Sequence, residues 1–281
     1  MAFNWKTFWT RTWTALIFAA VMVTGLFWNQ WVFFILFSII HFGCWYEYQK
    51  LVAKFAPEYA TITPFHRYGI MLAGWCLLLF FTGSQLSGVG FSLHALGWWT
   101  GLSLLFILPI TELLFTRNIS LHNIRYSALG ILYISVSWGL LMDLRTHPEY
   151  GPLLPVAIIF SIWINDTMAY LVGSMIGRTP LTAISPKKTW EGTLGGILIS
   201  IAAMGVLAHY TNQPVFHTAM IAAIAAITGT FGDLLESKLK RLAGVKDSGQ
   251  IMPGHGGFLD RFDSLLIAVP FVWLYVKILL P

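Results

Sequence analysis

The stretch PVFHTAMIAAIAAITGTFGD, residues 214–233, carries no charged residue before its last position, Asp233. It is long enough to cross a membrane as a helix, which takes about 20 mostly apolar residues. The sequence then changes abruptly to LLESKLKRLAGVKDSGQIMPGHGGFLDRFDS (234–264), and a second apolar run follows over 261–279. This alternation predicts two membrane helices joined by a charged segment outside the hydrocarbon. Residues 232–264 are called the charged strip below.

The composition of the whole chain agrees with a membrane protein. Of its 281 residues, 57% are hydrophobic and 10% are charged, whereas soluble domains are about 45–50% apolar and about 25% charged. We therefore predict an all-α integral membrane protein. The net charge of +5 does not indicate a nucleic-acid partner, because basic residues in a membrane protein first report its topology. The two cysteines, Cys44 and Cys76, lie in or beside apolar runs and are expected to be packed thiols.

Nine segments are long and apolar enough to be candidate membrane spans. They are 12–28, 30–47, 67–84, 95–115, 124–142, 153–173, 192–210, 214–233 and 261–279. When the N-terminus is placed in the cytoplasm, every Lys and Arg except Arg145 and Lys277 falls in an inside segment. Cytoplasmic loops of membrane proteins carry such an excess of Lys and Arg. The sequence thus predicts nine helices, a cytoplasmic N-terminus and a C-terminus outside.

This topology places the charged strip on the cytoplasmic face. It divides the chain into N-terminal transmembrane helices (1–130) and a C-terminal catalytic region (131–281) with a cytoplasmic active-site loop at 234–260. Glu112 falls near the inner end of the fourth span, where an ionisable group is costly and needs a reason. We expect it to form a structural pair with a nearby base.

The acids of the charged strip lie at its two ends. Asp233, Glu236 and Ser237 share one face if the helix continues, since residues three and four apart are neighbours. Asp260 and Asp263 are likewise three apart at the start of the ninth span. Oxygen ligands of this kind suit Mg²⁺, which usually takes one or two carboxylates together with substrate phosphates. Acids at a helix N-terminus also complement the helix dipole, and the spacing leaves both interpretations open.

Bases and glycines lie between these acids. The bases of the strip are Lys238, Lys240, Arg241 and Lys246, and the preceding inside segment adds Lys187 and Lys188. They could neutralise the acids, attract anionic lipid head groups, or hold a polyphosphate. The glycines of PGHGG (253–257) leave backbone N–H groups open to phosphate oxygens, and His255 could be an acid–base group, a phosphate donor or a turn residue. Neither a Walker motif nor a dinucleotide fingerprint occurs.

A longer pattern runs through the strip. The segment SKLKRLAGVKDSGQIMPGHGGFLDRFD (237–263) resembles the signature of the phosphatidate cytidylyltransferases, also called CDP-diglyceride synthetases. The matching residues are Ser237, Lys240-Arg241, Lys246-Asp247, His255-Gly256-Gly257, Asp260-Arg261 and Asp263. Met252 departs from the pattern, in which Leu, Ile or Phe is usual. The segments NDTMAYLVG (165–173), SPKKTWEG (185–192) and GDLLES (232–237) are also similar to this family, and Lys188 is the matched lysine. The resemblance covers about 160–270, and the first 130 residues resemble the family only as a run of spans.

The resemblance implies an enzyme of phospholipid biosynthesis that transfers CMP from CTP to phosphatidate, forming CDP-diacylglycerol and pyrophosphate. It implies Mg²⁺, with one or two cations left open, and a site at the cytoplasmic face of the cell membrane. Asp233 and Asp260 become metal ligands, with Asp263 as a third ligand or as the residue that orients them. Lys188 and Lys240 join these acids as catalytic residues. The implied substrate-binding residues are Ser237, Arg241, Lys246, Asp247, His255, Gly256, Gly257, Arg261 and Asp166, the last of which is metal-related or pairs with Lys188. A homodimer is also implied.

Two alternatives remain at this point. One is a transporter of an anionic or phosphorylated solute, because intramembrane acids and a basic inner loop suit that function as well. A transporter, however, is expected to place its charges near the bilayer midplane at broken helices, whereas the charged strip lies at one face. The other alternative is a related enzyme that uses a different lipid phosphate as acceptor.

Overall fold

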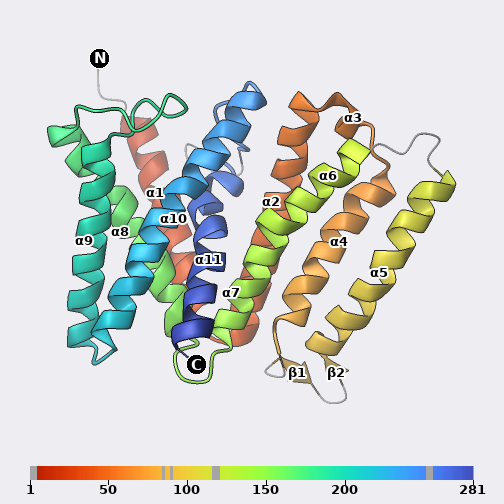
Figure 1. Cartoon of the computed structure of the whole chain (residues 1–281), viewed down its shortest axis with the longest axis horizontal. Coiled ribbons are helices and arrows are strands. Elements are labelled where there is room, and N and C mark those ends of the chain that lie inside the picture. Colours follow the sequence, from red (N-terminus) through yellow and green to blue (C-terminus); the bar gives the residue numbers. More distant parts are fainter. Residues whose placement is uncertain (1–4, 84–85, 89–90, 116–120, 251–255, 281) are drawn as a thin grey trace. The chain divides into compact units, whose positions relative to one another are not determined.

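Figure 1 shows the computed structural model of the chain, which describes residues 5–83, 86–88, 91–115, 121–250 and 256–280. Most of these residues are helical. In order, the helices are α1 (Trp5–Phe27), α2 (Gln30–Phe55), α3 (Pro57–Ala60), α4 (Pro64–Phe80), α5 (Leu93–Phe115), α6 (Leu121–Gly130), the π-helix η1 (Ile131–Val136), α7 (Ser137–Arg145), α8 (Leu153–Ile176), α9 (Trp190–Tyr210), α10 (Val215–Leu242) and α11 (Leu259–Leu279). The short strands β1 (Ser87–Gly88) and β2 (Phe91–Ser92) pair antiparallel. The helical class predicted from the sequence is confirmed.

Helices occur at all nine expected spans, and seven helical segments of the described residues are long and apolar enough to cross a membrane. These seven are Gln30–Phe55, Leu93–Phe115, Asn123–Arg145, Leu153–Ile176, Trp190–Tyr210, Val215–Leu242 and Leu259–Leu279. The two remaining spans correspond to shorter helices, namely an apolar stretch of α1 over Thr12–Phe27 and the 17-residue α4. The chain is thus a multi-pass membrane protein.

Helix α10 runs further than the expected span, which ended at residue 233. It continues to Leu242, so the first residues of the segment expected as a loop (234–260) are helical. The extension keeps leucines at helical spacing in LLESKLKRL (234–242), and Lys240 and Arg241 in its last turn complement the helix dipole. Gly244 follows with φ +66°, a left-handed conformation typical of the residue that ends a helix.

The helices gather in two compact units. Unit 1 comprises Met1–Thr146 with Leu242–Arg261, and unit 2 comprises His147–Arg241 with Phe262–Pro281. The charged strip is therefore shared, because its middle belongs to unit 1 and its two ends belong to unit 2. The division at residue 130 that the sequence suggested falls within unit 1, at the junction of α6 and η1. A separate catalytic region over 131–281 stays a prediction.

The core of unit 1 is built around α2. This helix starts after Asn29, whose side chain accepts a hydrogen bond from the N–H of Val32 at 2.9 Å and so satisfies one of the donors left open at a helix start. Trp45 of α2 is fully buried, and its Nε1 donates to Ser135 Oγ in η1 at 2.8 Å. His41, one turn earlier, contacts the same hydroxyl at 3.0 Å. These bonds fix the rotation of α2, and with it the face on which Glu47 lies.

In unit 2, small residues let helices approach closely. A Cβ on Gly196 of α9 would lie 2.7 Å from the carbonyl oxygen of Asn165 in α8, and one on Gly192 would lie 2.6 Å from that of Ala169. Ser200 also donates to the carbonyl of Ser161 at 2.9 Å. Close backbone packing of this kind stabilises helix pairs in membranes, where lipid is as apolar as the side chains.

Candidate functional site

The segment SPKKTWEG places Lys188 just before α9. Thr189 caps α9, because its hydroxyl accepts a hydrogen bond from the N–H of Gly192 at 3.2 Å. The carbonyl of Lys188 accepts from the N–H of Leu181 at 2.7 Å, which ties the segment to the chain that follows α8. The Glu191 carboxylate adds a bond from the hydroxyl of Thr179 at 2.9 Å. The backbone at Lys188 is thereby held on both sides.

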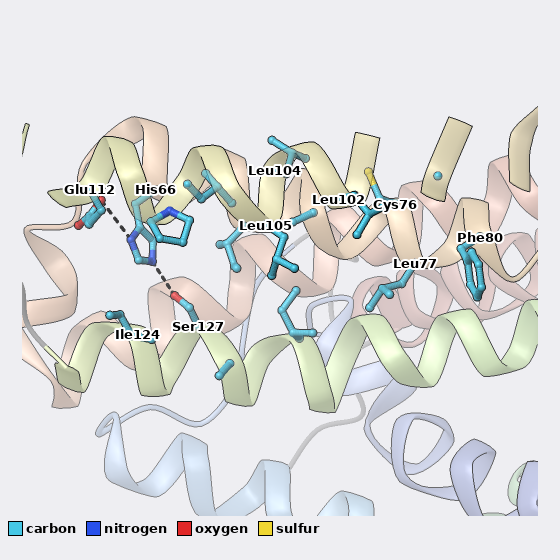
Figure 2. Close-up of a pocket in the computed structure, with 18 of the residues that line it drawn as sticks. His66, Cys76, Leu77, Phe80, Leu102, Leu104, Leu105, Glu112, Ile124 and Ser127 are labelled. Atoms are coloured by element: carbon cyan, nitrogen blue, oxygen red, sulfur yellow. Dashed lines mark hydrogen bonds and ion pairs between the residues drawn. The ribbon is translucent and has the colours of Figure 1, made fainter. Parts of the chain in front are cut away.

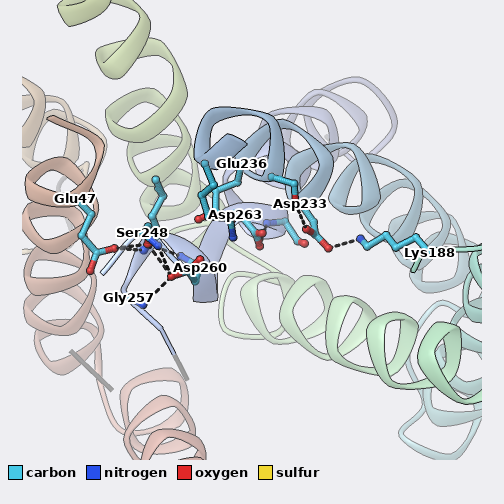
Figure 3. A network of polar contacts seen from close by, with 12 residues as sticks. Glu47, Lys188, Asp233, Glu236, Ser248, Gly257, Asp260 and Asp263 are labelled. Atoms are coloured by element: carbon cyan, nitrogen blue, oxygen red, sulfur yellow. Dashed lines mark hydrogen bonds and ion pairs between the residues drawn. The ribbon is translucent and has the colours of Figure 1, made fainter. Parts of the chain in front are cut away.

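The Lys188 ammonium forms an ion pair with Asp233 of α10 (Figure 3). The other oxygen of Asp233 accepts a hydrogen bond from Ser237 Oγ at 3.2 Å, one helical turn further on. The Lys188 and Asp233 side chains are 28% and 30% exposed. Both groups therefore remain within reach of a solute, and the ion pair holds the carboxylate in one orientation.

A second ion pair of α10 is buried. Glu236 has no exposed surface and pairs with Lys240 one turn later, whose side chain is 14% exposed. Helix α10 continues through Asp233, Glu236 and Ser237, so these residues share one helix face although a loop was expected after residue 233. Because Glu236 is fully covered, its pair with Lys240 mainly holds the ammonium in place.

Helix α10 meets α11 at Gly232. A Cβ at this glycine would overlap the carbonyl oxygen of Asp263 and would lie 2.9 Å from the Cα of Ser264. This contact brings Asp263, which is 8% exposed, into electrostatic range of Asp233, Lys240 and Asp166. Helices α10 and α11 therefore pack closely against each other at this contact. Unit 2 thus gathers three acids and two lysines of the predicted site.

We expect replacement of Gly232 by Ala to destabilise the protein by about 1–3 kcal/mol, the usual cost of an extra methyl group in a packed contact. Thermal unfolding in detergent would measure the loss. Gly205→Ala in α9 is the matched control, because a Cβ there meets nothing closer than 3.9 Å. Equal unfolding temperatures for the two variants would contradict the close contact of α10 with α11.

The donor set in unit 2 fits a hard cation. Carboxylates and a hydroxyl are the ligands that Mg²⁺ prefers, and this ion commonly takes only one or two carboxylates, with phosphate oxygens and water completing its shell. No three His, Cys, Asp or Glu side chains converge as a ready-made metal site among the residues that the structure describes. The arrangement thus suits a cation that arrives together with a phosphate substrate.

Asp260 belongs to unit 1 and organises the glycine segment before α11 (Figure 3). Its Oδ2 accepts hydrogen bonds from the N–H of Ser248 and the N–H of Gly257, both at 2.8 Å. Gly256 adopts φ +83°, and a Cβ there would lie 2.5 Å from the same oxygen. The N–H of Gly257, which the sequence suggested as a phosphate donor, is therefore bonded within the protein.

The remaining predicted substrate-binding residues lie on the surface or outside the described part. Arg241 of unit 2 is exposed, and so are three residues of unit 1: Lys246, Asp247 and Arg261. His255 lies outside the described residues. Asp166 is also exposed and accepts a hydrogen bond from the Asn165 side chain at 3.2 Å. The sequence left Asp166 as either metal-related or paired with Lys188, and the structure shows an ion pair of Lys188 with Asp233.

Two residues of this region escaped the sequence analysis. Glu47 of α2 is 2% exposed and Ser248 is 8% exposed, and a hydrogen bond of 2.8 Å joins their side chains. A signal for Glu47 was present, because it is an acid at the end of an expected span and such groups are functional candidates by default. Ser248 gave no signal, since serine is common in loops.

A further polar cluster lies at a cavity of unit 1. The cavity has a volume of about 910 Å³ and is lined mostly by apolar residues of α4, α5, α6 and η1 (Figure 2). His66 contacts Glu112 at 3.4 Å and Ser127 at 2.8 Å. Glu112 thus lies beside a base, as expected from the sequence, and a structural role for the pair stays a prediction.

The family model described as "Cytidylyltransferase family" matches residues 9–279 of the chain. The chain is 48% identical over 141 residues to the phosphatidate cytidylyltransferase of Synechocystis sp., an alignment that covers 48% of each protein. It is 35% identical over 171 residues to the enzyme of the same name from Bacillus subtilis, covering 59% of this chain and 64% of that protein. The corresponding enzyme of Haemophilus influenzae is 34% identical over 189 residues, covering 64% and 65%. The chain thus spans between about half and two thirds of the length of these relatives.

Proposed function

The chain belongs to the cytidylyltransferase family, and we propose that it transfers CMP from CTP to the phosphate of phosphatidate. The products are CDP-diacylglycerol and pyrophosphate. The main observation that supports the proposal is the match of the family model to residues 9–279. The names of the similar proteins support phosphatidate as the acceptor. The ion pair between Lys188 and Asp233 supports a phosphate site, since it joins two residues of the segments that resemble the family.

In the proposed reaction an oxygen of the phosphatidate phosphate attacks the α-phosphorus of CTP. The new P–O bond forms as the bond from the α-phosphorus to the oxygen bridging to the β-phosphate breaks, and pyrophosphate leaves with that electron pair. A phosphomonoester has a second pKa near 6 and is already mostly dianionic at pH 7. The nucleophile therefore needs no strong general base.

The main obstacle is repulsion between two anions. Like unit charges about 4 Å apart repel by roughly 4 kcal/mol at an effective dielectric of 20. We propose that Lys188, Lys240 and Arg241 offset this repulsion, and that Ser237 holds Asp233 in orientation through its hydrogen bond. We assign Lys246, Asp247 and Arg261 to substrate binding at the surface, together with His255, Gly256 and Gly257.

We propose Mg²⁺ as the cofactor, held by Asp233 and Asp260, with Asp263 as a third ligand or as the residue that orients them. The oxygen donors near Asp233 suit this ion. When bound, the cation would neutralise phosphate charge and make the α-phosphorus more electrophilic. That Asp233 and Asp260 share one cation stays a prediction.

Replacing Asp260 by Asn tests the metal role separately from the structural one. Asn keeps a carbonyl oxygen that can accept from Ser248 and Gly257, but it loses the negative charge. We expect CDP-lipid formation to fall about tenfold and the Mg²⁺ concentration needed for half-maximal rate to rise, as for a lost metal ligand. Near-normal turnover with an unchanged Mg²⁺ requirement would remove Asp260 from the metal site.

The activity itself is tested by supplying labelled CTP and Mg²⁺ to the purified protein in detergent. Parallel reactions would contain phosphatidate, a polyprenyl phosphate or no lipid, and both the CDP-lipid and pyrophosphate would be measured. The proposal expects both products with phosphatidate. Reaction with the polyprenyl phosphate alone would favour the alternative acceptor. Uptake of solute by vesicles without pyrophosphate release would favour a transporter.

We further propose nine spans with the N-terminus in the cytoplasm, the C-terminus outside, and the site at the cytoplasmic face of the cell membrane. The distribution of Lys and Arg supports this topology. Labelling of single cysteines at Lys246 and Gln213 by an impermeant reagent tests it, because these positions fall on opposite sides.

A homodimer is proposed from the family resemblance, and the mass of the protein in a lipid nanodisc tests that proposal.

A further inference from the structure

Glu47 is a buried acid in a helix that is long and apolar enough to cross a membrane. It lies on α2 and is 2% exposed. Burying a carboxylate is costly unless hydrogen bonds or a counter-charge compensate it. In the part of the chain that the structure describes, no Lys, Arg or His lies within ion-pair distance of it. Its compensation therefore comes from hydrogen bonds.

Three donors converge on the Glu47 carboxylate, and all come from the far end of the sequence. They are the Ser248 hydroxyl and the N–H groups of Phe258 and Leu259. Oε1 accepts from the N–H of Phe258 at 3.0 Å, and Oε2 accepts from the N–H of Leu259 at 2.8 Å. The first N–H groups of a helix lack partners within that helix and carry the positive end of its dipole. Glu47 thus caps the N-terminus of α11 from a position more than 200 residues away in the chain.

The surroundings are shaped to admit this carboxylate. A Cβ on Gly249 or on Gly257 would overlap the Glu47 side chain. One turn before Glu47 on α2, a Cβ on Gly43 would overlap the ring of Phe258. Three glycines on both sides of the contact therefore leave the space that Glu47 and the start of α11 occupy, and the capping arrangement is built into the packing.

Ser248 connects Glu47 to Asp260 (Figure 3). Its hydroxyl lies 2.8 Å from Glu47 Oε2 and 2.8 Å from Asp260 Oδ2, while its N–H donates to the same Asp260 oxygen. A hydroxyl has one proton and donates to one acceptor at a time. Glu47 and Asp260 thus compete for this proton. A change at one carboxylate therefore alters the hydrogen bond that Ser248 donates to the other.

We propose that Glu47 is a positioning residue for the cytidylyl transfer. It fixes the first turn of α11 and, through Ser248, the orientation of the Asp260 carboxylate. This role rests on the proposed function of the chain. Glu47 itself is enclosed by three donors, so it acts through Asp260 and not on the substrate. A helix outside the segments that resemble the family signature therefore positions Asp260 within unit 1.

Replacing Glu47 by Gln tests the proposal. The two oxygens of Glu47 both accept hydrogen bonds, whereas the amide of Gln turns a donor toward one of the N–H groups. We expect kcat to fall several-fold, by no more than the loss of about tenfold expected for Asp260→Asn, and the Mg²⁺ requirement to rise, with the KM for phosphatidate within about twofold of normal, as for the loss of a group that orients a metal ligand. Glu58→Gln, an exposed acid of unit 1, is the matched control and should behave as the original protein.

Hydrogen exchange supplies a readout that does not depend on activity. The amides of residues 257–259 should exchange faster in Glu47→Gln than in Glu58→Gln, because their acceptor is altered. Unchanged exchange together with unchanged kcat would overturn the positioning role. Exchange could be faster in Glu47→Gln while the unsubstituted protein shows no cytidylyl transfer at all. In that case the proposed function fails and the capping contact stands.

Ser248→Ala keeps the test decisive if Glu47→Gln does not fold. It removes only the hydroxyl that joins the two carboxylates and leaves the bonds from Phe258 and Leu259 to Glu47. We expect a smaller fall in kcat in the same direction, with normal exchange at residues 258 and 259. A normal kcat and a normal Mg²⁺ requirement in Ser248→Ala would show that Glu47 does not act through Asp260.

Discussion

Replacing Asp233 by Asn is expected to lower kcat by about 10²–10³-fold, the usual loss when one fixed charge of a catalytic electrostatic arrangement is removed. The residue pairs with Lys188, accepts a bond from Ser237 and stays 30% exposed to an incoming substrate. Asn preserves the size of the side chain, so the loss reports the charge. Steady-state formation of CDP-diacylglycerol from CTP and phosphatidate would measure it.

Glu149→Gln is the matched control for this variant, because Glu149 is an exposed acid of the same unit. Lys188→Met completes a double-mutant cycle. If Lys188 and Asp233 act as one group, the second substitution should cost far less in the Asp233→Asn background than alone. Additive losses, or an Asp233→Asn variant with near-normal kcat, would contradict the assignment.

Replacing Lys240 by Met is expected to destabilise the protein by about 3–5 kcal/mol, because removing one partner of a buried ion pair leaves the other charge uncompensated. Its partner Glu236 has no exposed surface. Thermal or denaturant unfolding in detergent, monitored by tryptophan fluorescence, would measure the loss.

Lys238→Met provides the control, since Lys238 is exposed on the same helix two residues earlier. The double variant Glu236→Leu with Lys240→Met should recover most of the lost stability, because an apolar pair of similar size can replace a buried ion pair at little cost. If the double variant is no more stable than Lys240→Met, the destabilisation does not come from the stranded charge of Glu236.

The sequence predicted most of the fold because hydropathy is a local property. Each apolar run could be recognised in isolation, and helices occur at all nine expected positions. The end of α10 was misplaced for the same reason. The charged residues after Asp233 ended the apolar run, while the leucines of 234–242 allowed the helix to continue beyond it. Membrane span and helix length are separate properties, and hydropathy reports only the first.

The candidate site was predicted in part. The sequence of the charged strip indicated Asp233, Lys240 and Asp263 as site residues. In unit 2, Asp263 lies within electrostatic range of both Asp233 and Lys240. The sequence left Asp166 as either metal-related or the partner of Lys188, and it did not indicate the ion pair of Lys188 with Asp233. The position of Asp263 beside α10 depends on the close approach of α10 to α11, which Gly232 permits through the absence of a side chain.

The sequence by itself thus determined the membrane class, the helical segments and the family, since each of these can be recognised from contiguous residues. Only the tertiary structure showed that Glu47 caps α11 and that Ser248 joins it to Asp260. When a helix is apolar on all sides, its sequence does not indicate which face packs against which neighbouring helix. The partner of a buried acid is therefore decided by helix rotation and by the space that glycines leave, and both arise only when distant segments pack.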